Sequence, residues 1–203
     1  MDIQVTNLDG TYTLCEELNT LASVKGGKII TDLGTTINNL KNNWIGTDAN
    51  NHISNLITVH NVLVKIVTEA KKITYSAGNA MIAIQEIRRA NGGEGNVGAP
   101  LSNSEPSSLT LTAPEPTTDY DVKPGAKNDL ESLKTLCTNF ETFAKDFQTQ
   151  KESLMKNWTA GAGWENAVRT FDDFLMYTAN YKKKLEDARD NLDIAIQNVS
   201  SLS

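Results

Sequence analysis

Apolar side chains recur at alternating steps of three and four residues along most of the chain, a pattern typical of helices that pack against neighbours. The clearest run covers residues 47–90, and two more cover residues 128–157 and 164–201. A fourth run, over about residues 8–42, is less regular. No segment alternates apolar and polar residues for long enough to build a sheet. The pattern therefore predicts an all-α chain of four long helices.

The pair Gly26-Gly27 interrupts the first of these helices. Two glycines in a helix interior cost about 1–2 kcal/mol together relative to alanine. We therefore expect either a kink in this helix or the close approach of a neighbouring backbone.

All five prolines lie between Pro100 and Pro124, in a stretch that is also rich in Gly, Ser and Thr. Because long helices exclude interior proline, this composition predicts a linker over residues 93–125. The linker separates two helical hairpins, residues 1–92 and 126–203, and each hairpin has an apolar seam that needs cover. The economical solution is a four-helix bundle made of two antiparallel helical hairpins. An extended linker reaches about 100 Å, which exceeds the length of about 65 Å for the longest helix, so it permits this arrangement.

The turn of each predicted hairpin carries a tryptophan. Trp44 is followed two positions later by Gly46, in the sequence NNWIGTDANN. Trp158 is followed by small residues that include Gly161, in the sequence KNWTAGAGWE. Glycine accepts the dihedral angles of a helix reversal, and Thr47 or Asp48 can cap the helix that follows the first turn. We expect each indole to pack over an end of the bundle, with its N–H bonded to a loop carbonyl.

At these residues the chain resembles the WXG superfamily, the early-secreted-antigen-like proteins of type VII (ESX) secretion. The resemblance rests on the tripeptide WIG at Trp44–Gly46, between two amphipathic helices. Members of that family are helical hairpins with the motif in the turn, and they pair as antiparallel dimers that form four-helix bundles. The resemblance implies two units fused in tandem, a first WXG-type hairpin at residues 1–92 and a second, degenerate one at residues 126–203.

The chain departs from the family pattern in two respects. Ala160 stands where the family has glycine, although Gly161 directly after it can still serve the turn. Exported members often carry Tyr-x-x-x-Asp/Glu after the second helix. Here Tyr177 is followed four positions later by Tyr181, and Tyr181 by Leu185. In the second helix of the first hairpin, Tyr75 is followed four positions later by Asn79. Export with a partner, or by a different signal, stays open as an alternative.

The charge balance limits the classes of partner. The formal net charge is −6, which argues against a nucleic-acid binder, because such a protein needs an electropositive surface. No stretch approaches the roughly 20 apolar residues of a membrane span, so we expect no transmembrane segment. The first ten residues lack the basic and apolar regions of a Sec signal peptide, so secretion is expected to need no Sec signal. The alternative is a cytoplasmic protein.

No constellation of residues indicates catalysis, and we expect no enzyme, no cofactor and no metal. His52 and His60 lie about 12 Å apart along one helix, too far to share a metal ion, and His60 is expected to be a hydrogen-bonded core residue. The two cysteines, Cys15 and Cys137, have no metal-binding spacing. Buried thiols are the expected state, with a disulfide between the hairpins as the alternative.

The functional hypothesis is a non-enzymatic protein–protein interaction protein, a tandem WXG-type substrate or adaptor of a bacterial type VII-like system. Its partners would be proteins, such as the secretion ATPase or a co-secreted effector. We expect a monomer, because the fused hairpins form an intramolecular pseudo-dimer. The site residues are Trp44, Gly46, Trp158 and Gly161, and their tryptophans either only plug the hinges or also form a surface that a partner recognises. The competing hypothesis is a cytoplasmic helical scaffold or targeting domain that is not exported.

Overall fold

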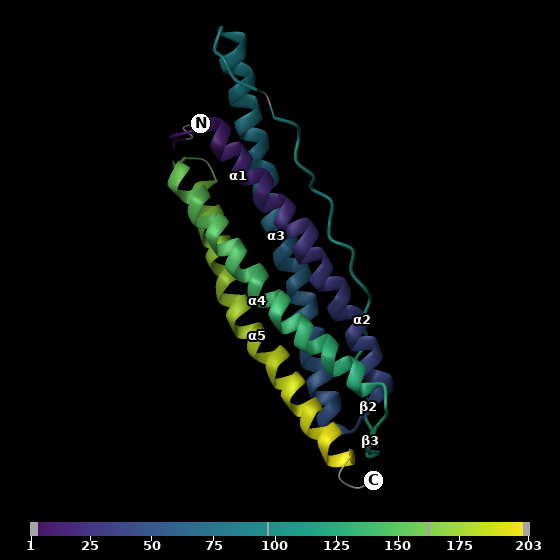
Figure 1. Ribbon diagram of the computed structural model, residues 1–203. Helices are drawn as coiled ribbons and strands as arrows, with labels where there is room; N and C mark the ends of the chain where they lie inside the picture. The colour runs from purple at the N-terminus through teal and green to yellow at the C-terminus, as the bar shows by residue number, and fades with distance from the viewer. Residues whose placement is uncertain (1–3, 97, 162, 201–203) are drawn as a thin grey trace. The chain divides into compact units, whose positions relative to one another are not determined.

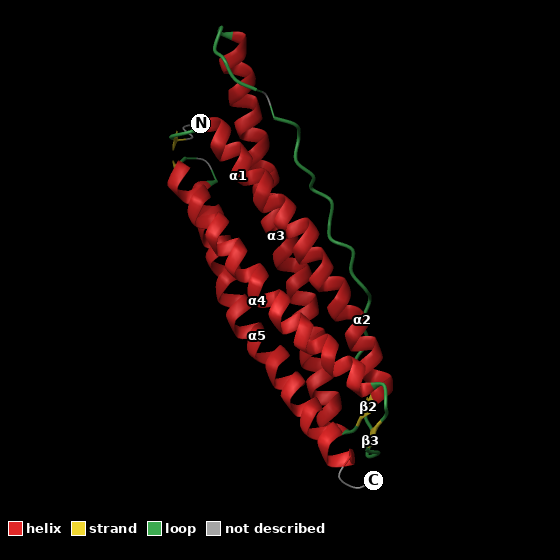
Figure 2. Cartoon of the chain, in the orientation of Figure 1, coloured by secondary structure: helices red, strands yellow, loops and turns green. Residues whose placement is uncertain are grey.

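The computed structural model describes residues 4–96, 98–161 and 163–200. The described part of the chain is mostly helical (77%), and helices dominate the cartoon in Figure 2. The predicted all-α class is therefore confirmed.

Four continuous helical runs account for this content (Figure 1). The first consists of helix α1 (Leu8–Leu21), a π-helical turn η1 (Ala22–Gly26) and helix α2 (Gly27–Asn43). The others are α3 (Thr47–Ala90), α4 (Ala126–Asn157) and α5 (Trp164–Ser200). All four runs lie where the periodicity predicted helices.

The described residues also form four very short strands, which the sequence did not predict. Strand β1 (Gln4–Val5) pairs antiparallel with β4 (Trp158–Ala160), and β2 (Trp44–Ile45) pairs antiparallel with β3 (Asp121–Val122). Two or three residues are too few to show a period of two, so the pattern of polarity cannot reveal such strands.

The Gly26-Gly27 pair lies where η1 meets α2. A Cβ atom on Gly26 would lie 3.0 Å from a methyl carbon of Val67 and 3.1 Å from the ring of Phe143. A Cβ atom on Gly27 would have no neighbour within 4 Å. Gly26 therefore leaves room for side chains of α3 and α4, and the helical run passes this point as a π turn.

Helix α3 begins and ends by local backbone contacts. The carbonyl of Gly46 accepts a hydrogen bond from Asn50 N at 2.9 Å at its start. The hydroxyl of Thr47, a predicted cap, instead donates to the carbonyl of Thr117 at 3.4 Å. At its end, Gly92 has a φ of +81° and donates to the carbonyl of Arg89 at 3.0 Å. Gly92 thus ends the helix in the left-handed conformation that glycine adopts without strain.

The chain divides into two compact units that each draw on both predicted hairpins. The first unit takes its described residues from 1–26, 66–106 and 143–176. The second takes them from 27–65, 107–142 and 177–203. The assignment of domains to residues 1–92, 93–125 and 126–203 stays a prediction.

The core of the first unit contains four phenylalanines, Phe143 and Phe147 of α4 and Phe171 and Phe174 of α5, each at most 1% exposed. The rings of Phe147 and Phe174 stack with centroids 4.0 Å apart, and Phe143 and Phe171 make edge contacts with this pair at 5.5 Å. Such rings bury a large apolar area and hold the two helices together.

The core of the second unit is mainly aliphatic. Its members are supplied by α2, α3, α4 and α5 at the predicted seam positions. They include Leu33, Ile37, Leu40, Ile53, Leu56, Leu133, Phe140, Leu185 and Leu192, all fully buried. The bundle-like character that the sequence predicted is thus present in the packing of each unit.

Both cysteines are free thiols and buried, Cys15 in the first unit and Cys137 in the second. Burial raises the pKa of Cys15 to about 12, so this thiol stays protonated and unreactive at neutral pH. The structure thus shows the expected buried thiols rather than the alternative disulfide.

Candidate functional site

The first tryptophan hinge lies in the second unit. Trp44 is 3% exposed, and its indole stacks on the ring of His52 with centroids 5.5 Å apart and an interplanar angle of 15°. Gly46 has a φ of +144°, and a Cβ atom at this position would lie 3.2 Å from the ring of Tyr120. Only glycine combines that backbone conformation with the space available.

The segment before α4 closes this hinge. Trp44 pairs with Val122 in the β2–β3 ladder, and the carbonyl of Asn43 accepts a hydrogen bond from Lys123 N at 2.9 Å. The side-chain amide of Asn43 also donates to the carboxylate of Asp129 at 2.8 Å. Asp129 is only 2% exposed, and this burial raises its pKa, although the hydrogen bond from Asn43 acts to lower it.

The second tryptophan hinge lies in the first unit. Trp158 is 3% exposed and pairs with Val5 in the β1–β4 ladder. The carbonyl of Asn157 accepts a hydrogen bond from Thr6 N at 2.9 Å. Gly161 has a φ of +111° and accepts a hydrogen bond from Trp164 N at 3.1 Å. Gly161 thus has the positive φ that Gly46 has in the first hinge.

The same pattern of backbone hydrogen bonds closes both hinges. In each, the carbonyl of the asparagine before the tryptophan accepts a backbone N–H, from Lys123 in one hinge and from Thr6 in the other. The tryptophan strand pairs in each case with a two-residue strand that directly precedes a long helical run. The donors come from segments that carry no distinctive sequence signal, so sequence reasoning missed them.

The indole hydrogen bond of the second hinge is made by a different tryptophan than expected. Trp164 Nε1 donates to the carbonyl of Trp158 at 2.8 Å. The N–H of Trp158 itself is buried and has no hydrogen-bond partner. Trp164 stands at the first residue of the predicted helical run 164–201, whereas the similarity of the two turn sequences points to Trp158 alone.

No group of three or more His, Cys, Asp or Glu side chains within residues 4–96, 98–161 and 163–200 could hold a metal ion. His60 is 1% exposed, its Nδ1 lies 3.2 Å from Asn61 Oδ1, and burial lowers its pKa. Its Nε2 is buried without a partner, so the predicted core histidine is hydrogen-bonded on one side only.

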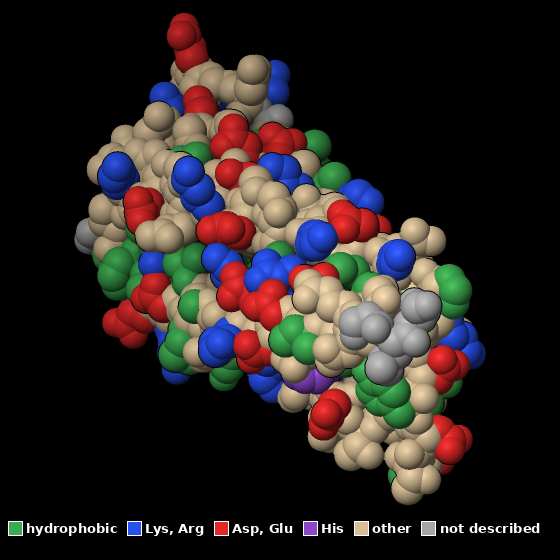
Figure 3. Space-filling model, turned by 60° about the horizontal axis from the view of Figure 1, so that its bottom comes forward, with side chains coloured by type: hydrophobic (Ala, Val, Ile, Leu, Met, Phe, Trp, Pro, Cys, Tyr) green, Lys and Arg blue, Asp and Glu red, His purple; other side chains and the backbone are tan. Residues whose placement is uncertain are grey.

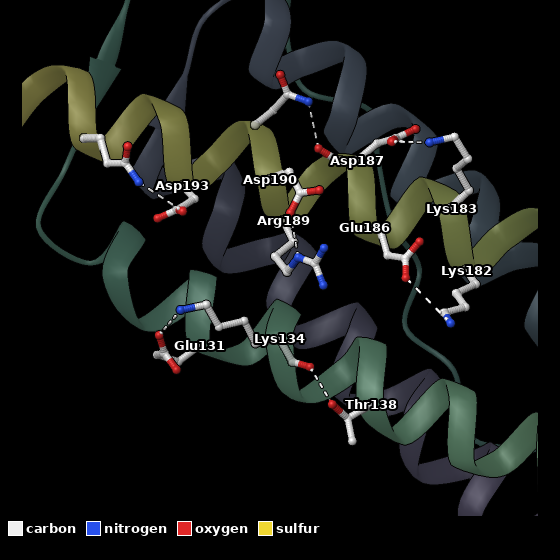
Figure 4. A network of polar contacts seen from close by, with 12 residues as sticks. Glu131, Lys134, Thr138, Lys182, Lys183, Glu186, Asp187, Arg189, Asp190 and Asp193 are labelled. Atoms are coloured by element: carbon white, nitrogen blue, oxygen red, sulfur yellow. Dashed lines mark hydrogen bonds and ion pairs between the residues drawn. The ribbon is translucent and has the colours of Figure 1, made fainter.

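Two lysines of the basic run of α5, Lys182 and Lys183, pair with carboxylates. In the second unit Lys182 lies 3.2 Å from Glu141 and 3.7 Å from Glu186, and Lys183 lies 3.0 Å from Asp187. Figure 4 shows several of these pairs on α5, together with the Lys134–Glu131 pair of α4. On the face shown in Figure 3, basic and acidic side chains are interspersed. This surface does not offer the concentrated positive charge that nucleic acid requires.

Comparison of the chain with protein-family models, with curated proteins and with solved structures found no match. Among the helices of the described residues, none is both long and apolar enough to cross a membrane.

Proposed function

We propose that the chain is a non-enzymatic protein–protein interaction protein, a tandem WXG-type substrate or adaptor of a bacterial type VII-like secretion system. In this proposal the two hairpins, joined by the linker, take the place of a WXG dimer. Fusion fixes their stoichiometry and removes the concentration dependence of pairing.

One observation carries the proposal. Trp44, in the turn of one hairpin, pairs with Val122, which precedes the first helix of the other. Trp158, in the turn of the second hairpin, pairs with Val5, which precedes the first helix of the first. An antiparallel dimer of hairpins brings each turn to the open end of its partner, and this reciprocal pairing is what such an arrangement requires.

A partner protein would bind the first hinge through the exposed side chain of Tyr120 rather than through the indole of Trp44. Trp44 is 3% exposed, so its ring serves to fill the hinge, whereas Tyr120 is 60% exposed and packs against Gly46. Exposed aromatic side chains with a polar end are common at protein interfaces. Tyr120 is therefore the residue of this hinge through which a secretion component would be recognised.

The test is secretion by a host with a type VII system, with and without its membrane ATPase. We expect the wild-type chain in the culture supernatant only when the ATPase is present. Tyr120→Ser should reduce export with little change in thermal stability, and Tyr177→Ser, a substitution of an exposed tyrosine on α5, serves as the matched control. Retention of the wild-type chain in the cell with an active ATPase would contradict the proposal.

The second candidate function is a cytoplasmic scaffold that is not exported, and one observation favours it. Leu185 occupies the position at which a Tyr-x-x-x-acid signal starting from Tyr181 would need a carboxylate. Leu185 is fully buried in the core of the second unit. Since a carboxylate at that point would have to be buried, α5 cannot present the signal there, and the same secretion experiment separates the two functions.

A further inference from the structure

A surface of the first unit holds part of the linker in place. Residues 98–104 form an extended segment without helix or strand, drawn beside α1 and α3 in Figure 1. The side chains that hold it come from α1 and from the part of α3 that belongs to the first unit. We call them the linker-binding surface, which consists of Tyr12, Asn19, Lys71, Gly78 and Gln85.

Most of the polar contacts of this surface are directed at the backbone of the segment. Tyr12 Oη donates to the carbonyl of Ala99 at 2.6 Å, and Asn19 Nδ2 donates to the carbonyl of Ser102 at 3.1 Å. Gln85 Oε1 accepts from Gly98 N at 3.1 Å. Because these bonds involve main-chain atoms, they recognise an extended conformation and do not depend on the identity of the side chains.

One leucine of the segment provides an apolar anchor. Leu101 is 9% exposed and lies over Gly78 of α3. A Cβ atom on Gly78 would lie 2.5 Å from Leu101 Cδ1, and Cys15 Cβ lies 3.8 Å from the same Cβ position. The glycine thus leaves a recess that the leucine fills, and Pro100 before it favours the extended conformation.

A buried amine completes the surface. Lys71 is 3% exposed, and its Nζ donates to the carbonyl of Ser104 and to Ser104 Oγ. Burial lowers the pKa of Lys71. A buried amine is costly unless it is hydrogen-bonded, so this surface needs the carbonyl oxygen of an occupant at this point.

The linker leaves one end of the surface unfilled. A pocket of about 450 Å³ adjoins the start of the segment and is lined by Asp9, Tyr12, Gln85, Gly95 and Asn96, among others. Among the described residues of the linker, Gly95, Asn96 and Gly98 line this pocket. Asp9 is exposed, and its Oδ1 accepts a hydrogen bond from Gln85 Nε2 at 2.8 Å. The linker offers this carboxylate no basic side chain, because no basic residue lies between Arg89 and Lys123. A ligand with a basic residue at this end would make a contact that the linker lacks.

We propose that the linker-binding surface is a site for an extended segment of a partner protein, of the form basic–x–small–small–Pro–Leu. Residues 98–104 occupy this site in cis. Because the cis segment is covalently attached, its effective concentration is on the order of millimolar. The linker therefore occupies the site until a partner segment with a better fit to the Asp9 pocket displaces it. This site is distinct from the hinges and does not rest on the secretion role.

The test uses the full-length chain and a fluorescent synthetic peptide of residues 94–106 carrying Asn96→Arg, with binding followed by fluorescence anisotropy. Leu101→Asp in the chain weakens the cis segment by placing a charge in its anchor recess. Leu109→Asp is the matched control, because Leu109 is another linker leucine that packs on a helical glycine, Gly34 of the second unit. Leu101→Ala is the milder variant to use if the aspartate variant loses helicity.

We expect the peptide to bind the Leu101→Asp chain at least about tenfold more tightly than the wild-type or the Leu109→Asp chain, since the cis competitor is weakened. A peptide that itself carries Leu101→Asp should not bind, and one with Glu in place of the introduced Arg should bind more weakly. Adding Gly78→Val to the Leu101→Asp chain should abolish peptide binding, because the valine side chain then fills the recess.

Three results would overturn the proposal. The first is equal binding of the peptide to the Leu101→Asp, Leu109→Asp and wild-type chains. The second is no binding of the peptide to a Leu101 variant that retains wild-type helicity. The third is dimerisation of the wild-type chain through exchanged linkers, detected by light scattering, which would assign the surface to a second copy rather than to a separate partner. All three are measured on purified protein, so they are independent of the outcome of the secretion experiment.

Discussion

The side-chain amide of Asn43 donates to the carboxylate of Asp129 at 2.8 Å and so joins two residues that are 86 positions apart in the sequence. The bond ties the end of α2 to the first turn of α4 beside the first tryptophan hinge. Its acceptor is almost completely buried, and burial raises the pKa of that carboxyl group above its ordinary value of 3.8.

The raised pKa of Asp129 determines the direction in which pH changes the stability of the fold. A carboxyl group with a raised pKa in the folded state favours folding when protonated, so its stabilising contribution is complete below pH 3.8 and is lost as the pH rises through the folded pKa. Asp129→Asn keeps an acceptor for Asn43 and removes the buried charge. We expect a higher melting temperature than wild type at pH 7 and a difference that shrinks toward pH 3, measured by circular dichroism. Asp48→Asn, at an exposed position in the first turn of α3, should not show this trend.

The titration of His60 should change the stability of the fold with pH in the opposite direction to that of Asp129. Burial lowers its pKa below 6.5, so the neutral ring stabilises the fold above pH 6.5, and this contribution is lost as the pH falls through the folded pKa. His60→Leu removes the titrating group and the buried Nε2 that lacks a partner. We expect the loss of stability of the wild type between pH 7 and pH 5, measured by urea unfolding, to be smaller in the variant. An unchanged slope would show that the histidine does not control this range.

Trp44→Ala should lower the free energy of unfolding by about 3–5 kcal/mol, because the substitution leaves a large cavity at a buried site. The loss is measured by chemical unfolding. Tyr177→Ala is the control, since Tyr177 is 38% exposed and stacks on Tyr181, and its effect should stay below about 1 kcal/mol. Equal effects of the two substitutions would show that the indole does not support the hinge.

Two glycines should respond to alanine with opposite signs. Gly46→Ala forces a φ of +144° on a residue with a Cβ atom and brings that atom to 3.2 Å from Tyr120, so a loss of about 1–3 kcal/mol is expected. Gly27→Ala meets no atom within 4 Å in α2 and should stabilise by about 0.5–1 kcal/mol. Thermal unfolding of the two variants measures both effects, and a stabilising Gly46→Ala would refute the account of the first turn.

The linker should resist proteolysis more than its composition suggests. Lys71 holds Ser104 through its carbonyl and hydroxyl oxygens, so Lys71→Ala should speed cleavage after Glu105 by a Glu-specific protease several-fold, because opening of the segment becomes more frequent. Lys72→Ala is the matched control, since Lys72 is exposed and pairs only with Glu69 among the described contacts. The products are followed by mass spectrometry, and equal cleavage rates for the two variants would contradict the role given to Lys71.

The sequence by itself determined the helices of this protein. A helix depends on local periodicity and on the residues that end it, and both were visible in the run 47–90, in the proline-rich stretch and in Gly46. The same local signals located the turns at Trp44 and Trp158, and the burial of both rings agrees with their expected place at a hinge.

Only the tertiary structure decided what closes the hinges and where the linker lies. Val122 and Val5 pair with the tryptophan strands, and Tyr12, Asn19 and Lys71 bind the linker backbone. These partners are far apart in the sequence, and main-chain hydrogen bonds leave almost no preference in the side chains that make them. Contacts of that kind are set by how the helices pack, which a pattern of residues along the chain does not record.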